Sequence, residues 1–256
     1  MVFVHGNSSS ARVWQPLLAG GFGDRFRCLA LDLPGHGRSA PATRPEVYSL
    51  PGYATILAGF LTELAVEDAV IVGWSLGGNI ALEAAPRLPD VTGFAILGTP
   101  PVGTADQLAE AFLPNPAVNI GFTAELDHDA AQSYAESFLA PQSTLPLDDF
   151  VADILATDGA ARADLLTSVQ AGQFANQVDI VAKLTQPIAV LHGQHEQLVN
   201  LEYLRGLTMP TLWRHAVQVL PDAGHTPQAE TPQALEEILT EFLTDDGVRR
   251  RTLSSR

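Results

Sequence analysis

Short, continuous apolar runs alternate with longer segments of mixed polarity along most of the chain. The runs are rich in Val, Ile, Leu and Ala, and they occupy residues 2–4, 28–31, 69–72, 93–97, 187–191 and 217–220. Runs of this length without polar alternation predict strands that are buried on both faces, as in a parallel sheet. Separation of such strands by helical segments predicts an α/β fold with a mostly parallel sheet. Ligands of such sheets bind at the carboxyl ends of the strands.

The pattern changes between residues 98 and 184, where no strand-like run is present. Apolar residues recur there at helical spacing, over residues 105–113, 130–139, 148–156 and 160–171. We expect residues 101–185 to form a helical cap inserted into a core made of residues 1–100 and 186–247. The basic, polar end of the chain, residues 248–256, is predicted to be a disordered tail.

Composition narrows the range of partners. The chain has 256 residues, of which 46% are hydrophobic, so it is long enough to bury a full core. Its 29 acidic and 14 basic residues give a net charge of -15. Such a charge repels phosphate backbones and anionic lipid surfaces. A small-molecule substrate is therefore expected, with no nucleic acid and no membrane partner, while oligomeric state is left open.

Two features favour a cytoplasmic location. The single cysteine, Cys28, excludes an internal disulfide and is interpreted as a buried thiol in a strand. No apolar run reaches the roughly 20 residues that a membrane span needs, and residues 1–6 lack the features of a signal peptide.

The most informative motif is Gly-Trp-Ser-Leu-Gly, which follows the apolar run at residues 69–72 and precedes a helical segment. A serine between two such glycines, on a sharp turn from strand to helix, is typical of a nucleophile elbow. Gly73 and Gly77 would leave room for the tight backbone. Ser75 is therefore the candidate nucleophile.

A histidine follows the last predicted strand. His225 lies in the loop after residues 217–220, where its imidazole can reach a serine hydroxyl at the same edge of the sheet. Imidazole titrates near neutral pH, as a general base requires. His225 is the candidate base.

A carboxylate after the strand at residues 187–191 would complete a triad in the chain order Ser, acid, His. Glu196 is the candidate, because it would hold the imidazole tautomer and stabilise the imidazolium. Glu202 and Asp222 compete for this role. Glu202 is expected to open the next helix, and Asp222 lies in the same tight loop as His225.

The turn after the first strand is a candidate oxyanion hole. We predict that backbone N–H groups of Asn7 and of Trp74, taken as the residue after the nucleophile, stabilise the oxyanion. His5 is interpreted as a buried structural histidine. The turn-rich segment 32–39 is interpreted as a structural loop beside the site.

Metal and dinucleotide chemistry are not indicated. His192, His195 and Glu196 lie on a segment from strand to loop instead of on one helical face, which disfavours a zinc site. The glycines of residues 73–78 lack the spacing of a dinucleotide fingerprint. We therefore predict no cofactor and no metal.

Several motifs together resemble the α/β-hydrolase superfamily, and more closely its serine-dependent N-acylhomoserine lactonases, which open the lactone ring of bacterial signals. The resemblance runs nearly end to end. Segments 5–10, 32–37 and 73–78 are shared by many hydrolases of this fold, whereas segments 98–102, 157–159 and 176–181 favour the lactonase branch.

The resemblance implies further details. It gives Glu196 the role of the triad acid. It also matches Tyr134 to a cap tyrosine that hydrogen-bonds the substrate. Relatives carry a β-hairpin before the first strand, so an N-terminal hairpin is expected to be missing here and a sheet edge exposed. His195 stands where many relatives have an acidic residue. Apolar cap residues are expected to line an acyl-chain pocket: Phe112, Phe122, Phe138 and Leu139.

The sequence thus favours a serine hydrolase that opens N-acylhomoserine lactones through an acyl-serine intermediate. The first alternative is a general carboxylesterase that uses the same triad on small esters. A second alternative is a receptor of this fold that binds a lactone-like ligand and turns it over slowly.

Overall fold

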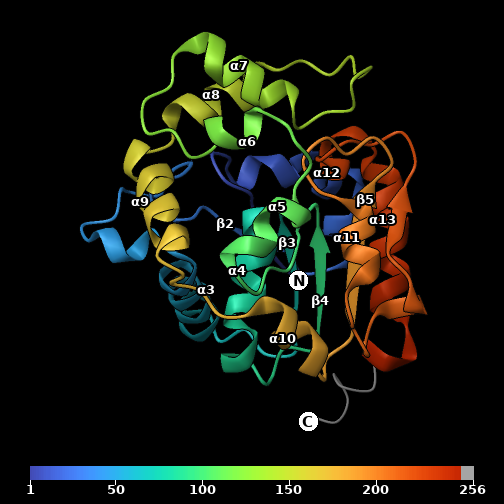
Figure 1. Ribbon diagram of the computed structural model, residues 1–256. Helices are drawn as coiled ribbons and strands as arrows, with labels where there is room; N and C mark the ends of the chain where they lie inside the picture. The colour runs from blue at the N-terminus through green and yellow to red at the C-terminus, as the bar shows by residue number, and fades with distance from the viewer. Residues whose placement is uncertain (249–256) are drawn as a thin grey trace.

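One parallel sheet of six strands organises the computed structural model, which describes residues 1–248 (Figure 1). The strand order is β2-β1-β3-β4-β5-β6. The strands are β1 (Val2–Val4), β2 (Leu29–Leu31), β3 (Val70–Trp74), β4 (Gly93–Leu97), β5 (Ile188–Gly193) and β6 (Gln218–Leu220). Each predicted strand is therefore present, and the α/β prediction is confirmed. Apart from Val248, the predicted tail lies outside the described residues.

The first strand of the chain lies inside the sheet. Val2 of β1 pairs with Leu29 on one side and with Ile71 on the other, and all pairings are parallel. Strand β2 is left at the edge, where Leu29 and Ala30 are half-buried. Cys28 was predicted to be a buried strand residue, but it precedes β2 and is only half-buried, because it lies at the start of this edge strand.

The centre of the sheet forms the hydrophobic core. Every residue of β3 and β4 is buried, which explains why both strands are continuous apolar runs. Burying one large aliphatic side chain contributes about 1.5–3 kcal/mol. The central strands are therefore anchored by burial, and their carboxyl ends give a firm support for reactive side chains.

Helices flank the sheet and begin at recognisable caps. Ser49 caps the helix that follows it and accepts a hydrogen bond from the Gly52 amide (3.0 Å), and Asp127, Asp158 and Asn176 act similarly. The helices are α1 (Gln15–Leu17), α2 (Gly23–Arg25), α3 (Leu50–Glu63), α4 (Leu76–Ala84), α5 (Leu108–Ala111), α6 (Ala117–Ile120), α7 (His128–Glu136), α8 (Asp148–Ala156), α9 (Gly159–Gln170), α10 (Gln177–Lys183), α11 (Leu201–Gly206), α12 (Pro227–Glu230) and α13 (Pro232–Thr244).

The segment between β4 and β5 is helical, as the sequence predicts. Helices α6, α7 and α8 lie together beyond the carboxyl ends of the strands, and α9 descends beside them toward α3 (Figure 1). We call helices α5 to α9 the cap. The division of the chain at residues 101 and 185 stays a prediction, and α10, inside those bounds, packs against α4 of the core.

Within residues 1–248, no helix combines the length and the apolar character that crossing a membrane requires. The cytoplasmic location stays a prediction.

Candidate active site

Ser75 occupies the turn between β3 and α4. Its backbone angles, φ 53° and ψ -120°, lie in a region that residues other than glycine rarely adopt. The turn is held on both sides: the Ser75 amide donates to the Leu97 carbonyl (2.8 Å), and the Ser75 carbonyl accepts from the Thr99 hydroxyl (2.9 Å). This strained strand-turn-helix geometry is that of a nucleophile elbow.

The surrounding glycines are required by close packing. A Cβ atom on Gly73 would lie 2.5 Å from the Gly77 backbone, and one on Gly77 would collide with the Val4 carbonyl. A Cβ on Gly6 would lie 2.9 Å from the Trp74 ring. The first strand, the elbow and helix α4 thus approach more closely than side chains permit, which agrees with the role expected for Gly73 and Gly77.

His225 and Glu196 form a direct pair. The Nδ1 atom of His225 lies 2.7 Å from Oε2 of Glu196, and the two side chains are 2% and 1% exposed. The second carboxylate oxygen of Glu196 accepts from the Leu198 amide (2.8 Å). Burial acts to raise the pKa of Glu196, but the adjacent imidazole and these hydrogen bonds outweigh burial and lower that pKa. A buried carboxylate that stays ionised can orient the imidazole and stabilise its protonated form.

The competing carboxylates do not reach the histidine. Glu202 lies in the first turn of α11, as predicted, and pairs with Arg205 at the surface. Asp222 is exposed, in a loop with φ 57°. The hydroxyl of Ser75 forms no hydrogen bond within the described chain, and Ser75 is half-buried. Nucleophile–base contacts are often long in ligand-free sites.

Two contacts that sequence reasoning did not predict hold the loop of His225, one made by Trp74 and one by Gly98. The indole Nε1 of Trp74 donates to the His225 carbonyl (2.7 Å), which ties the histidine loop to the residue before the nucleophile. Gly98 has φ 52°, and a Cβ there would lie 2.7 Å from Nδ1 of His225. Only glycine leaves room for the imidazole, and the Gly-Thr-Pro-Pro segment was the available signal for this role.

The predicted oxyanion residues differ in their surroundings. Asn7 follows β1, and its amide nitrogen takes part in no backbone hydrogen bond within residues 1–248. Trp74 is the last residue of β3 and precedes Ser75, so its amide belongs to the strand. Leu76 begins α4, and the first amides of a helix have no partner inside the helix. The prediction that Trp74 follows the nucleophile is wrong, because Trp74 precedes Ser75, and the residue after the nucleophile is Leu76.

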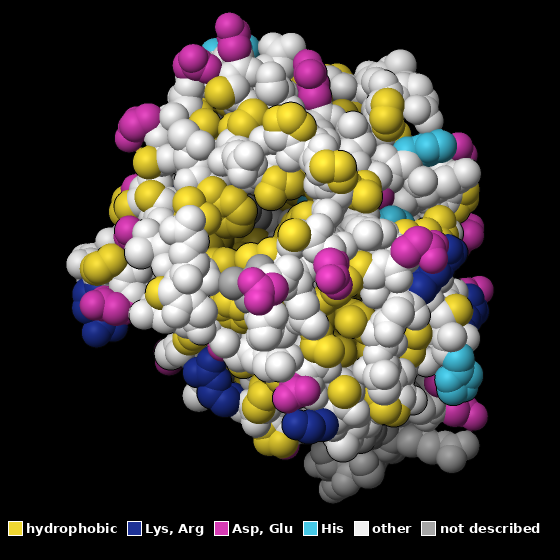
Figure 2. Space-filling view, in the orientation of Figure 1, with side chains coloured by type: hydrophobic (Ala, Val, Ile, Leu, Met, Phe, Trp, Pro, Cys, Tyr) yellow, Lys and Arg dark blue, Asp and Glu magenta, His cyan; other side chains and the backbone are white. Residues whose placement is uncertain are grey.

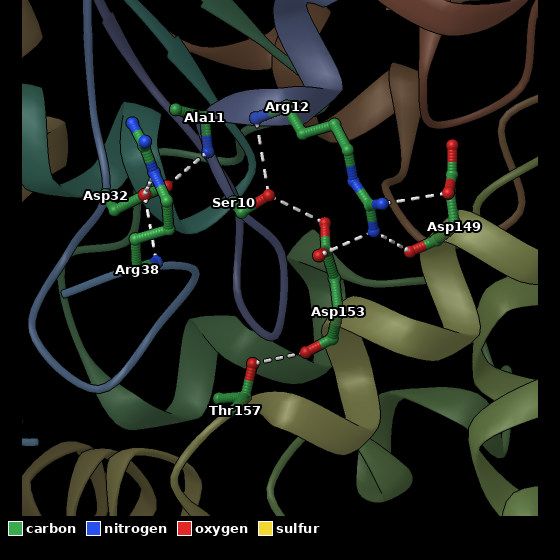
Figure 3. A network of polar contacts seen from close by, with 8 residues as sticks. All are labelled: Ser10, Ala11, Arg12, Asp32, Arg38, Asp149, Asp153 and Thr157. Atoms are coloured by element: carbon green, nitrogen blue, oxygen red, sulfur yellow. Dashed lines mark hydrogen bonds and ion pairs between the residues drawn. The ribbon is translucent and has the colours of Figure 1, made fainter. Parts of the chain in front are cut away.

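The segment that carries Asn7 is fastened to the cap. We call residues 7–12 the oxyanion loop. Arg12 pairs with Asp149 (2.8 Å) and Asp153 (2.8 Å) of α8, and the Ser10 hydroxyl also donates to Asp153 (2.8 Å). Figure 3 shows these side chains bridging the loop and α8. Burial is the main cause that raises the pKa of Asp153.

Tyr134 lies in α7 and is buried against Phe138, with ring centroids 4.6 Å apart. Its hydroxyl packs at Gly121, whose carbonyl accepts from the Asn7 side chain. Burial raises the pKa of the phenol, against the opposing effects of Arg162 and of Asn7. Tyr134 is therefore a neutral hydrogen-bonding group near the start of the oxyanion loop.

A cavity of about 940 Å³ opens beside the elbow, where Leu76 and Asn79 of α4 form part of its wall. Figure 2 shows a hollow surrounded by hydrophobic side chains in this face of the molecule. Phe112 and Phe122 line the cavity, as expected for an acyl-chain pocket. Phe138 and Leu139 do not line this cavity. They are buried in the connection between α7 and α8, where Phe138 packs on Trp74 and His225.

Two further predictions concern structural residues. His5 is fully buried, accepts from the Leu33 amide (3.0 Å), and has a pKa lowered to about 4 by burial, so its imidazole is a neutral structural group. Asp32 accepts hydrogen bonds from the amides of Ala11 (2.7 Å) and Arg38 (3.0 Å), so segment 32–39 supports the oxyanion loop. Within residues 1–248, no cluster of three His, Cys, Asp or Glu side chains is arranged to hold a metal ion.

A parallel sheet with a serine elbow and an acid–histidine pair at its carboxyl ends, beneath a helical insertion, defines the class of α/β hydrolases. The profile of the alpha/beta hydrolase family matches residues 1–238. The chain therefore belongs to the alpha/beta hydrolase family and is an enzyme of that class.

Several characterised proteins are similar over most of their length. The crystal structure of N-acyl homoserine lactonase AidH complexed with N-butanoyl homoserine is 35% identical, with a TM-score of 0.90, covering 95% of this chain and 88% of that one. The 2-(acetamidomethylene)succinate hydrolase of Mesorhizobium japonicum is 29% identical over 95% of this chain and 87% of its own. The 2-succinyl-6-hydroxy-2,4-cyclohexadiene-1-carboxylate synthase of an Enterobacter species is 30% identical over 95% of this chain and 91% of its own.

Proposed function

We propose that this protein is a serine hydrolase that opens the lactone ring of N-acylhomoserine lactones. The observation that carries the proposal is the likeness of the whole fold, cap included, to the lactonase AidH at 35% identity and a TM-score of 0.90. A serine-to-glycine variant of AidH was solved with N-hexanoyl homoserine lactone. The apolar cavity beside the elbow has room for such an acyl chain.

In the proposed reaction, His225 takes the proton of the Ser75 hydroxyl as Oγ attacks the lactone carbonyl. Glu196 holds the imidazole through Nδ1 and stabilises the imidazolium. The backbone amides of Asn7 and Leu76 stabilise the oxyanion, and Leu76 takes the place predicted for Trp74 because it follows the nucleophile at the start of α4.

Collapse of the tetrahedral intermediate breaks the ring C–O bond, and His225 protonates the leaving oxygen. The product of this step is an acyl-serine that still carries the homoserine hydroxyl. That hydroxyl can close again on the ester at high effective concentration. Water activated by His225 must therefore attack first, releasing the acylhomoserine and restoring Ser75.

Tyr134 is proposed to hydrogen-bond the substrate from the cap side. Its buried phenol adjoins Asn7, which supports a position close to the reacting carbonyl. Tyr134→Phe removes only the hydroxyl, so we expect a lower kcat/KM for lactones and little change for a small aryl ester.

The proposal is tested by following proton release from butanoyl and decanoyl homoserine lactones with wild type and Ser75→Ala, with and without a chelator. Wild-type turnover that survives the chelator and is lost in Ser75→Ala would support it. Rapid aryl-ester cleavage without lactone turnover would favour a general carboxylesterase. Slow turnover of a tightly bound lactone would favour a receptor.

A further inference from the structure

Arg162 of α9 is a buried cation that forms no direct ion pair within residues 1–248, and Glu125 and Asp158 act on it only from a longer distance. The residue is 3% exposed, and no carboxylate of the described chain forms an ion pair with it. Burial lowers the pKa of its guanidinium. A buried charge is costly unless hydrogen bonds compensate for the lost water. The position of this arginine therefore calls for a specific explanation.

The guanidinium binds three carbonyls of the cap and one hydroxyl outside it. Its Nε and Nη2 atoms donate to the carbonyls of Thr123 (2.7 Å) and Ala124 (2.6 Å), and Nη1 donates to that of Ile154 (3.1 Å). The remaining contact joins Nη1 to Oγ of Ser8 (3.3 Å). Arg162 thus links the α6–α7 connection and the end of α8 to the oxyanion loop.

Ser8 is held in an unfavourable conformation. It is 1% exposed and has φ 54°, in the left-handed region where a side chain is strained. Its hydroxyl accepts from Arg162 and donates to Oδ1 of Asn7 (3.3 Å). Ser8 follows Asn7 directly in the chain, and its hydroxyl also holds the Asn7 side chain, so Ser8 helps to fix the segment in which the Asn7 amide lies.

We propose that Arg162 is a positioning residue for the oxyanion hole, acting through Ser8 on the Asn7 amide. This inference rests on the proposed function, which gives the Asn7 amide its role. An oxyanion donor is effective only when it lies about 3 Å from the developing negative charge. Arg162 therefore contributes to kcat, and it makes the geometry of the hole depend on docking of the cap.

The sharpest test is Ser8→Gly. Glycine adopts φ 54° without strain, so this variant keeps or raises the melting temperature while it removes the hydroxyl link and frees the loop. We expect kcat to fall about tenfold or more, with KM within twofold, for both a lactone and p-nitrophenyl acetate. Arg162→Lys retains the charge and is expected to lose less of kcat than Arg162→Met.

Phe242→Leu is the control for instability alone. Phe242 of α13 packs at Gly93, the first residue of β4 and so at the sheet end away from Ser75. This variant should melt earlier with kcat unchanged. The inference is overturned if either Ser8→Gly or Arg162→Met keeps kcat within twofold, or if kcat only follows melting temperature across the four variants.

Failure of the proposed function gives a different result. Lactone turnover that persists in Ser75→Ala would reject the serine mechanism, whatever the Arg162 variants do. Loss of turnover in Ser75→Ala together with full activity in Ser8→Gly and Arg162→Met would reject only the positioning role.

Discussion

The core and the cap contribute to the candidate site in different ways. Glu196 and His225 follow strands β5 and β6 and are joined within the core by one short hydrogen bond. The oxyanion loop also leaves a core strand, but its side chains are fastened to the cap through Arg162 and α8. The same cap surrounds the large apolar cavity. In the proposed mechanism, proton transfer is therefore assigned to the core, whereas oxyanion binding and substrate choice are assigned to contacts with the cap.

The largest expected effect tests the core side of this comparison. Glu196→Gln leaves the shape of the pair but removes the charge that stabilises the imidazolium. We expect kcat to fall about 10⁴-fold for lactones and aryl esters alike. Glu202→Gln, at the exposed start of α11, is the matched control and should retain wild-type kcat. Equal losses in the two variants would contradict the assignment of Glu196.

The second effect is a loss of stability in acid, which we expect to be caused by two buried histidines of the core, His5 and His36. Burial lowers the pKa of His5 to about 4 and that of His36 to about 3. Below about pH 6.5, these two imidazoles bind protons in the unfolded chain but not in the folded protein. The free energy of unfolding therefore decreases as the pH is lowered.

Each histidine lowers that free energy by about 1.4 kcal/mol per pH unit, down to its folded pKa. Urea titrations at pH 7, 6 and 5 measure this slope. His5→Gln should reduce it, while His128→Gln, on the exposed start of α7, should leave it unchanged. A stability that is constant over this range would contradict the account.

The third effect distinguishes two aromatic residues of the cap segment. Phe122→Trp adds volume at the cavity wall, so we expect the ratio of kcat/KM for decanoyl over butanoyl homoserine lactone to fall about tenfold, or about 1.4 kcal/mol. Phe138→Leu alters packing on Trp74 and His225 instead. It should lower kcat for both substrates by a similar factor. Equal chain-length profiles in the two variants would refute this division.

The smallest effect is at the surface of the cap. Arg12 is 40% exposed and Asp149 78% exposed, and exposed ion pairs contribute about 0–1 kcal/mol. Asp149→Asn should therefore change the free energy of unfolding by less than about 1 kcal/mol and leave kcat close to wild type. Measurement in urea at low and high salt checks this. A larger loss would mean that the outer fastening of the oxyanion loop matters as much as Arg162.

The difference between core and cap also explains which features could be predicted from the sequence. Strands β1 and β4 were predicted with their observed bounds, because buried parallel strands are uninterrupted apolar runs. Ser75, Glu196 and His225 could be proposed as candidates from sequence because each follows such a strand, and parallel strands bring their carboxyl ends together.

The cap contributions were not predictable in this way. Helix α6 has four residues, too few for a periodic pattern. The contact of Arg162 with Ser8 spans 154 positions of the chain and leaves no local signal. Phe122 and Phe138 are equally apolar, and only packing separates the cavity wall from the core. The proposed second oxyanion donor is Leu76 instead of Trp74, because Leu76 follows Ser75 whereas Trp74 precedes it, and this order could have been taken from the sequence itself.

We propose that Ser75 attacks the lactone carbonyl, and trapping the acyl-enzyme would test this step directly. Wild type mixed with decanoyl homoserine lactone is quenched in acid within milliseconds and its peptides are weighed by mass spectrometry. The account predicts an adduct equal to the full mass of the lactone, on the peptide that contains Ser75, because the leaving hydroxyl stays attached. Turnover without any adduct, continuing in Ser75→Ala, would contradict it.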